Sequence, residues 1–180
     1  MELDKLLNTS RAKAAWWMRH AEGGGAFVEN TIHVVDLLRY LIGEIETVSA
    51  LIVERPDSTP DLDIPLSHCV TYGFECGAVA NATTCTALTR GGRSNLLILA
   101  DQDLMQLRGG ELRWAEEVIE CPERNSYAAE MRAFIDAISS GEANELRSPY
   151  ADGIKSLGAV LAAEVSAERG GEPVKLAEYL

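Results

Sequence analysis

The 180-residue chain lacks the features that mark membrane, metal-binding and nucleic-acid-binding proteins. No apolar run approaches the roughly 18 residues that a membrane span needs, and no basic segment followed by an apolar core opens the chain. The formal net charge of −12, without a dense basic cluster, would repel the phosphates of nucleic acids and anionic lipids. We therefore expect a cytoplasmic protein that contacts neither a membrane nor a nucleic acid.

The cysteines do not indicate a structural zinc site, because none of them forms a CxxC pair and no histidine lies at zinc-finger spacing from them. The four are Cys69, Cys76, Cys85 and Cys121. Most stand among apolar residues of strand-like segments, so we interpret them as buried free thiols in a reducing compartment. His68 precedes Cys69, and we interpret the two as neighbours that face opposite sides of a strand.

The composition, with 47% hydrophobic and 24% charged residues, is ordinary for one globular domain with a single core. We assign residues 1–180 to this domain. Residues 1–13 are interpreted as a loosely ordered extension, with a short helix over residues 2–7. The acidic segment 57–65 contains two prolines and is expected to be an exposed loop.

The order of the elements predicts an α+β fold. A helix over residues 26–42 is followed by about six strands, and helices over residues 126–139 and 149–168 close the chain. The strands are expected at residues 46–54, 67–74, 77–87, 93–100, 103–108 and 111–115. Strands this closely spaced, without helices between them, must run mostly antiparallel. The pattern therefore predicts a predominantly antiparallel open sheet with helices packed on one face.

The first helix carries the residues that suggest chemistry. On a wheel of about 100° per residue, polar or ionisable side chains share one narrow stripe. This stripe consists of Glu29, His33, Asp36 and Tyr40. The rest of the circle is mostly apolar, although Thr31 and Arg39 interrupt it, and Gly43 stands where the helix should end. We expect the stripe to line a cleft, and Arg39 to bury its stem and pair with an acidic neighbour such as Glu44 or Asp36.

Glu29 and His33 are four residues apart, so their side chains are expected within reach of each other. A carboxylate beside an imidazole raises its basicity, and the imidazole can then take a hydroxyl proton near neutral pH. Oxidation of a sugar hydroxyl requires such a proton transfer. Just upstream, Gly24 and Gly25 would let a cofactor or substrate approach the backbone at the helix N-terminus.

Two other interpretations of these residues stay open. His33 could be a structural helix histidine that only bonds Glu29 or Asp36, with the glycines serving as a loop. A metal could also gather the four residues His20, Glu22, Glu29 and His33, but their spacing matches no known metal motif, so we expect no metal site. The triple glycine is not a dinucleotide motif, since no strand with an alternating-glycine loop precedes it.

Residues 23–44 resemble a segment of the Gfo/Idh/MocA family of NAD(P)-dependent oxidoreductases. Glycines lead into an acidic residue, a histidine follows four positions later, and then come an aspartate, an apolar run and a closing glycine. Residues 171–176, Gly-Glu-Pro-Val-Lys-Leu, are similar to the closing segment of these enzymes. The resemblance covers about residues 14–176 and implies the dihydrodipicolinate-reductase-like C-terminal domain of glucose-fructose oxidoreductase, with a dimer contact through its sheet.

The resemblance also implies roles for individual residues. His33 would contact the reacting hydroxyl and move its proton, assisted by Glu29, which falls where the family commonly has aspartate. Four residues would bind or orient the substrate: Asp36, Tyr40, Trp17 and Asn30. Trp17 has a second interpretation as a packing residue, paired with Trp16.

The family's other half is missing from this sequence. Neither a dinucleotide-binding unit nor the family's Glu-Lys-Pro element occurs in it. The resemblance implies that an N-terminal Rossmann domain binds NAD or NADP in the parent enzyme, so this chain alone is expected to bind no cofactor and to be inactive. We expect the substrate-binding and dimerisation domain of a dehydrogenase that acts on a sugar, sugar derivative or cyclitol. The alternative is a cofactor-free binding or oligomerisation module of the same fold.

Overall fold

A single mixed sheet organises the protein in the computed structural model. The model describes residues 2–8, 16–56, 58–59, 61–88, 92–120, 125–142 and 146–179. Its strands, in chain order, are β1 (Glu2–Asn8), β2 (Ile45–Val53), β3 (Ser67–Phe74), β4 (Val79–Leu88), β5 (Arg93–Ala100), β6 (Asp103–Arg108), β7 (Glu111–Trp114), β8 (Glu117–Ile119) and β9 (Val174–Lys175). They lie in the order β8-β7-β6-β5-β1-β4-β3-β2-β9. Every neighbouring pair is antiparallel except β1 and β4.

The predominantly antiparallel α+β fold is thus confirmed, but the described residues form nine strands rather than about six. The helix expected over residues 2–7 is wrong, because Glu2–Asn8 is a strand between β4 and β5. Its leucines, lysine and glutamate favour a helix locally, whereas two neighbouring strands offer hydrogen bonds along both of its edges. Long-range pairing therefore overrides local propensity. Residues 9–13 of the expected extension lie outside the described residues.

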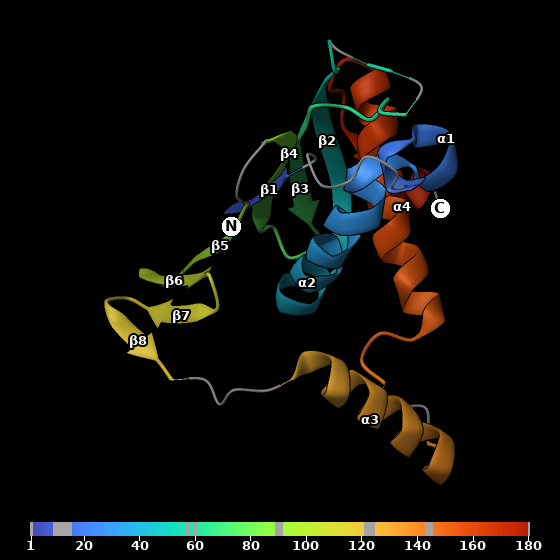
Figure 1. Ribbon diagram of the computed structural model, residues 1–180. Helices are drawn as coiled ribbons and strands as arrows, with labels where there is room; N and C mark the ends of the chain where they lie inside the picture. Colours follow the sequence, from blue (N-terminus) through green and yellow to red (C-terminus); the bar gives the residue numbers. More distant parts are fainter. Residues whose placement is uncertain are drawn as a thin grey trace.

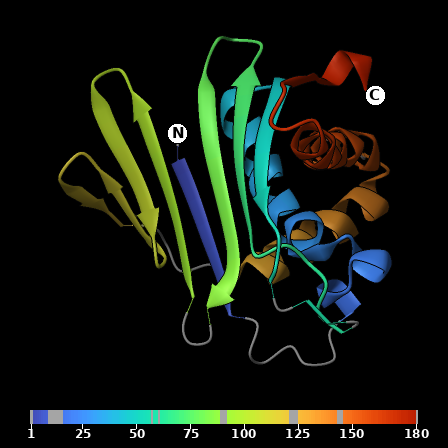
Figure 2. The ribbon, with the colours of Figure 1, turned by 90° about the horizontal axis from the view of Figure 1, so that it is seen from above.

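The helices are α1 (His20–Gly23), α2 (Ile32–Ile42), α3 (Ser126–Ser140) and α4 (Tyr150–Glu168). A π-helical turn, η2 (Phe27–Thr31), precedes α2, and short 3-10 turns form η1 (Trp16–Met18) and η4 (Leu176–Glu178). Figures 1 and 2 show α2 and α4 against the part of the sheet that contains β2 and β3, and Figure 1 shows α3 apart from them. No helix within the described ranges is long and apolar enough to cross a membrane.

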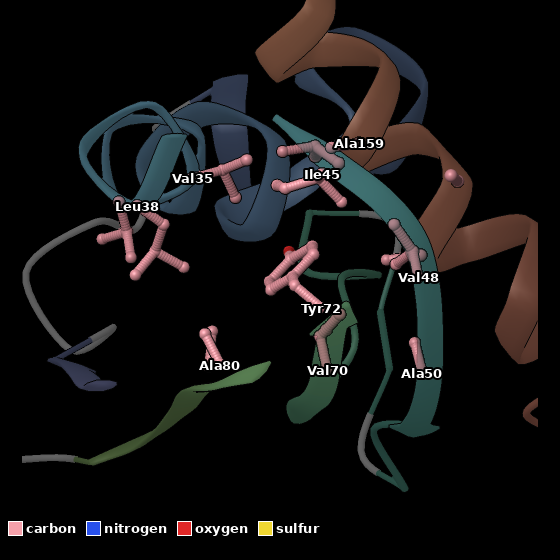
Figure 3. Packing of buried hydrophobic residues seen from close by; sticks show 14 of the residues in the cluster. Val35, Leu38, Ile45, Val48, Ala50, Val70, Tyr72, Ala80 and Ala159 are labelled. Carbon is pink, nitrogen blue, oxygen red and sulfur yellow. The ribbon is translucent and has the colours of Figure 1, made fainter. Parts of the chain in front are cut away.

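The core lies between these strands and helices (Figure 3). Alternate residues of β2, β3 and β4 point toward the helices, which gives the buried set Val48, Ala50, Val70, Tyr72, Ala80 and Ala82. From the other side come Val35 and Leu38 of α2 and Ala159 of α4. The small side chains of α4 allow its backbone to approach β2 closely, and the Ser166 hydroxyl accepts a hydrogen bond from the Ala50 backbone N–H at 2.9 Å.

The opposite face of the sheet is uncovered. Leu51 of β2 and Leu99 of β5 are exposed on it, as is Cys69 of β3. The expectation of buried thiols is therefore wrong for Cys69 and Cys76, which are exposed, and Cys85 is half-buried. The alternation that exposes Cys69 also buries His68, as expected.

The acidic loop before β3 is more than a solvated connection. Its residue Ile64 is buried and packs with Met18 and Ala26 in a second small cluster, against which Trp17 lies. Asp63 of the same loop accepts a hydrogen bond from the His20 backbone N–H at 2.6 Å. The loop thus fastens the segment that leads into the first long helix.

Candidate substrate site

The helix that carries the predicted site residues begins with the π-helical turn η2. Phe27, at its start, is fully buried and stacks on His68, with ring centroids 4.5 Å apart. At its end the hydroxyl oxygens of Thr31 and Thr84 are hydrogen-bonded at 2.7 Å in a buried position. These contacts hold the wide turn against β3 and β4, and thereby set the direction in which α2 leaves the sheet.

The π turn separates Glu29 from the other members of the polar stripe. Hydrogen bonds in such a turn span five residues rather than four, so a regular helical wheel does not apply across it. Glu29 lies within the turn and is half-buried, whereas His33 lies on α2 and is exposed. In the described part of the chain no hydrogen bond joins the two side chains.

The remaining members of the stripe line one hollow of about 890 Å³. It is bounded by α2, by the first residue of α3 and by the segment that leads into α4. The lining residues are His33, Asp36, Leu37, Arg39, Tyr40, Glu44, Ser126, Arg147, Ser148 and Asp152. His33 and Tyr40 are exposed, so an imidazole and a phenol are both accessible to a ligand in the hollow.

A buried guanidinium forms the base of this hollow. The Arg39 side chain is only 5% exposed, and it donates hydrogen bonds to Asp152 at 2.8 Å and to Glu44 at 3.1 Å. Burial disfavours its charge, but these two hydrogen bonds outweigh that effect and raise the pKa of Arg39. They also hold the pKa values of Glu44 and Asp152 below the usual range. The expected pairing of Arg39 with Glu44 is confirmed.

Asp36 is held in place by α4. Its Oδ1 accepts a hydrogen bond from the Ser156 hydroxyl at 2.9 Å, and the same hydroxyl accepts one from Arg39 at 2.7 Å. Ser148 lies at 3.5 Å from the same carboxylate oxygen. A carboxylate anchored on one oxygen can accept hydrogen bonds from ligand hydroxyls on the other.

Four lining residues were not foreseen from the sequence: Ser126, Arg147, Ser148 and Asp152. The Arg147 guanidinium donates to the Tyr40 phenol oxygen at 3.0 Å, although 107 positions separate the two residues. Such pairs follow from how α4 lies on α2, so no local pattern in the sequence could reveal them.

The other predicted residues lie away from the hollow. Gly24 ends α1 in the left-handed conformation, and Gly25 is buried with φ +85°, where an added Cβ would lie 3.0 Å from Ile64 Cγ2. The positive φ at both positions and the closeness of Ile64 to Gly25 explain why glycine stands there. Trp17 packs on the second small cluster, and Asn30 is half-buried in the π turn.

The four residues weighed as metal ligands do not converge. His20 lines a different hollow, together with Glu54 and Glu164, whereas His33 faces the hollow described above. Within the described ranges, no group of three or more His, Cys, Asp and Glu side chains is placed to hold a metal ion. The chemistry available in the candidate site is therefore that of an imidazole, carboxylates, hydroxyls and guanidinium groups.

Comparison with known proteins agrees with this architecture. A family model described as the GFO/IDH/MocA C-terminal domain matches residues 4–103, which is more than half of the chain. The uncharacterized protein UNK4.17 of Schizosaccharomyces pombe is 24% identical over 174 residues, which cover 81% of this chain and 42% of that protein.

Solved structures show the same fold. An oxidoreductase of Thermotoga maritima has a TM-score of 0.79 at 24% identity, covering 100% of this chain and 55% of its own. Levoglucosan dehydrogenase in complex with NADH and levoglucosan has a TM-score of 0.79 at 21% identity, covering 97% of this chain and 58% of its own. This chain thus spans about half the length of the proteins that it matches.

Proposed function

The chain belongs to the GFO/IDH/MocA C-terminal domain family, and from this premise we propose that it is the substrate-binding domain of an NAD(P)-dependent dehydrogenase. The substrate is a sugar, a sugar derivative or a cyclitol, oxidised at a hydroxyl group. The observation that carries the proposal is the hollow into which His33, Asp36 and Tyr40 open together from one helix.

These residues have different roles toward the substrate. Oxidation of a carbinol removes a proton from oxygen and a hydride from carbon, and His33 is placed to take the proton. The anchored carboxylate of Asp36 accepts hydrogen bonds from neighbouring hydroxyls, and the Tyr40 phenol contacts the substrate further along α2. Glu29 lies outside the hollow, so its contribution is to the surroundings of the π turn rather than to proton transfer.

A second domain must supply the hydride acceptor. On this chain, α3 presents an uncovered apolar face made by Tyr127, Met131, Phe134, Ile135 and Ile138, each at least half exposed. Apolar surface of this extent marks a protein contact. We assign this contact to an NAD(P)-binding domain, and we expect the 180 residues alone to have no dehydrogenase activity. The uncovered face of the sheet is the proposed homodimer contact.

The test is a His33→Ala substitution in the full-length dehydrogenase. Loss of the proton acceptor should lower turnover by about 100-fold at saturating cofactor, as expected for a lost general base. His20→Ala is the matched control, because His20 is also exposed but lines a different hollow. Unchanged turnover in a folded His33→Ala enzyme would rule out the catalytic assignment.

A further inference from the structure

The charges that line the hollow are unequally compensated. Its carboxylates are Asp36, Glu44 and Asp152. Glu44 and Asp152 share the Arg39 guanidinium, and Glu44 also accepts a hydrogen bond from Lys155 at 3.0 Å. Asp36 is bonded to Ser156 and lies 3.8 Å from Arg39. Every carboxylate of the hollow therefore has a cation or a hydroxyl donor within the protein.

Arg147 differs from these groups. Its Nη1 donates to the Tyr40 phenol oxygen at 3.0 Å, and its Cζ lies 5.7 Å from the centre of the same ring. The phenol is neutral, and within the described ranges no carboxylate pairs with this guanidinium. The lining of the hollow contains two arginines, Arg39 and Arg147, and of these Arg39 is already bonded to carboxylates. The positive charge of Arg147 is available to a ligand.

We propose that Arg147 binds an anionic group of the substrate, a carboxylate or a phosphate. The proposal rests on the proposed function, since it concerns the same hollow. A guanidinium carries five N–H donors in a planar fork, which matches the oxygens of a carboxylate or phosphate in a bidentate manner. Only one donor is engaged by Tyr40, and the exposed hydroxyl of Ser148 lies in the same lining. An anion can accept two parallel hydrogen bonds from the fork and also attracts its charge, so it gains more here than a sugar hydroxyl.

The position of Arg147 also restricts where the anionic group lies on the substrate. Arg147 is bonded to Tyr40, which is seven residues beyond His33 on α2, or about 10 Å along the helix axis. Asp36 lies between them on the same side. The anionic group and the oxidised hydroxyl therefore lie several bonds apart. This favours a uronic acid or a sugar phosphate over a 2-hydroxy acid.

The experiment compares neutral and anionic partners of one sugar. The full-length enzyme is assayed with D-glucose, D-glucuronate and D-glucose 6-phosphate, and with the corresponding galactose series, at constant ionic strength. Arg147→Gln should lower kcat/KM for the anionic sugars by about 30-fold, the loss expected for hydrogen bonds to a charged group. Values for the neutral sugars should change less than about 3-fold, and Arg147→Lys should be intermediate because it keeps the charge without the fork. Arg113→Gln, on the distant strand β7, should leave all values unchanged.

The arms of the assay separate the possible results. A loss for glucuronate alone identifies a carboxylate, and a loss for glucose 6-phosphate alone identifies a phosphate. An equal loss for neutral and anionic sugars, or a raised KM for NAD(P) with sugar values unchanged, would overturn the proposal. If neutral sugars are oxidised without any preference for an anion, the proposal fails while the proposed function stands.

If the enzyme oxidises none of these sugars, binding measurements still test the anion site at Arg147 separately from the dehydrogenase function. In that event the proposed function fails, and glucuronate and glucose 6-phosphate are titrated into the 180-residue chain and its Arg147→Gln variant. Binding that requires Arg147 would support the anion site independently of oxidation. Equal binding, or no binding, by both proteins would overturn it.

Discussion

At the scale of single residues, His68 is a titratable group whose environment departs strongly from water. The side chain is 4% exposed, it stacks on Phe27, and neither ring nitrogen has a hydrogen-bond partner in the described part of the chain. Burial, reinforced by the nearby His20, lowers the pKa of His68 to about 4. The imidazole is therefore neutral in the folded protein over the whole physiological range.

This environment predicts a pH-dependent stability. In the unfolded chain His68 has its ordinary pKa near 6.5, so acidification below that value protonates the unfolded state first. The folded state binds the same proton only near pH 4. The free energy of unfolding should therefore fall as the pH decreases from about 7 toward 4, by about 2 kcal/mol between pH 7 and pH 5.

Urea unfolding at pH 7 and pH 5 measures this contribution. His68→Phe keeps a planar ring against Phe27 but cannot bind a proton, so its stability should fall less over the same interval. The difference between wild type and variant isolates His68 from the carboxylates, which both proteins share. An identical pH dependence in the two proteins would show that the pKa of His68 does not differ between the folded and unfolded states.

At the scale of elements, α3 has residues that favour a helix start and a helix end, but none of its side chains is buried. The Asn125 side chain accepts the Ala128 backbone N–H at 3.1 Å, and Gly141 ends the helix in the left-handed conformation. None of its residues is buried, although its apolar side chains share the helical period. An isolated helix of this length is marginal in water, since most helical stability in proteins comes from packing of an apolar face.

We therefore expect α3 to open readily in the 180-residue chain. Hydrogen exchange should show its amides to be weakly protected, while those of α4, a longer helix packed on β2, exchange several orders of magnitude more slowly. In the full-length enzyme the docked NAD(P)-binding domain should restore protection to α3. Comparable protection of α3 and α4 in the 180-residue chain, or no gain in the full-length enzyme, would contradict the assigned contact.

At the scale of the whole molecule, one face of the sheet has no layer of helices over it (Figure 2). Figure 2 shows the helices on one side of the sheet, and on the other side Leu51 and Leu99 are 62% and 68% exposed. Antiparallel sheets tolerate one solvated face, but this one carries large apolar residues as well as polar ones. A symmetric pairing of two such faces would remove them from water.

Light scattering at micromolar concentration tests this pairing. We expect the mass of a dimer for the wild-type chain and a shift toward monomer for the double substitution Leu51→Asp and Leu99→Asp, because carboxylates at these positions would be desolvated in the contact. Leu41→Asp is the control, since Leu41 is also exposed but lies on α2. A monomeric wild-type mass would refute the dimer, and loss of the dimer only in the control would place the contact elsewhere.

Much of the fold follows from local signals in the chain. The strands at Ser67–Phe74, Arg93–Ala100 and Asp103–Arg108 coincide with the predicted ranges, and the terminal helices differ from prediction by one residue. Alternation of apolar residues and the glycines at turns act over a few positions, so they can be interpreted without the tertiary structure. The same holds for the expected burial of the Arg39 stem and its pairing with Glu44, five positions further along the chain.

Other parts of the fold and of the candidate site depend on contacts between segments that are distant in the sequence. The segment Glu2–Asn8 is a strand because β4 and β5 offer it two edges, and Glu29 leaves the polar stripe because a π turn is held by Phe27 and Thr31. Arg147 enters the hollow because α4 returns beside α2. The sequence alone therefore identified the helix that carries the candidate site residues, since helical periodicity is local. Which residues line the hollow depends on tertiary packing, because that packing brings together residues more than 100 positions apart.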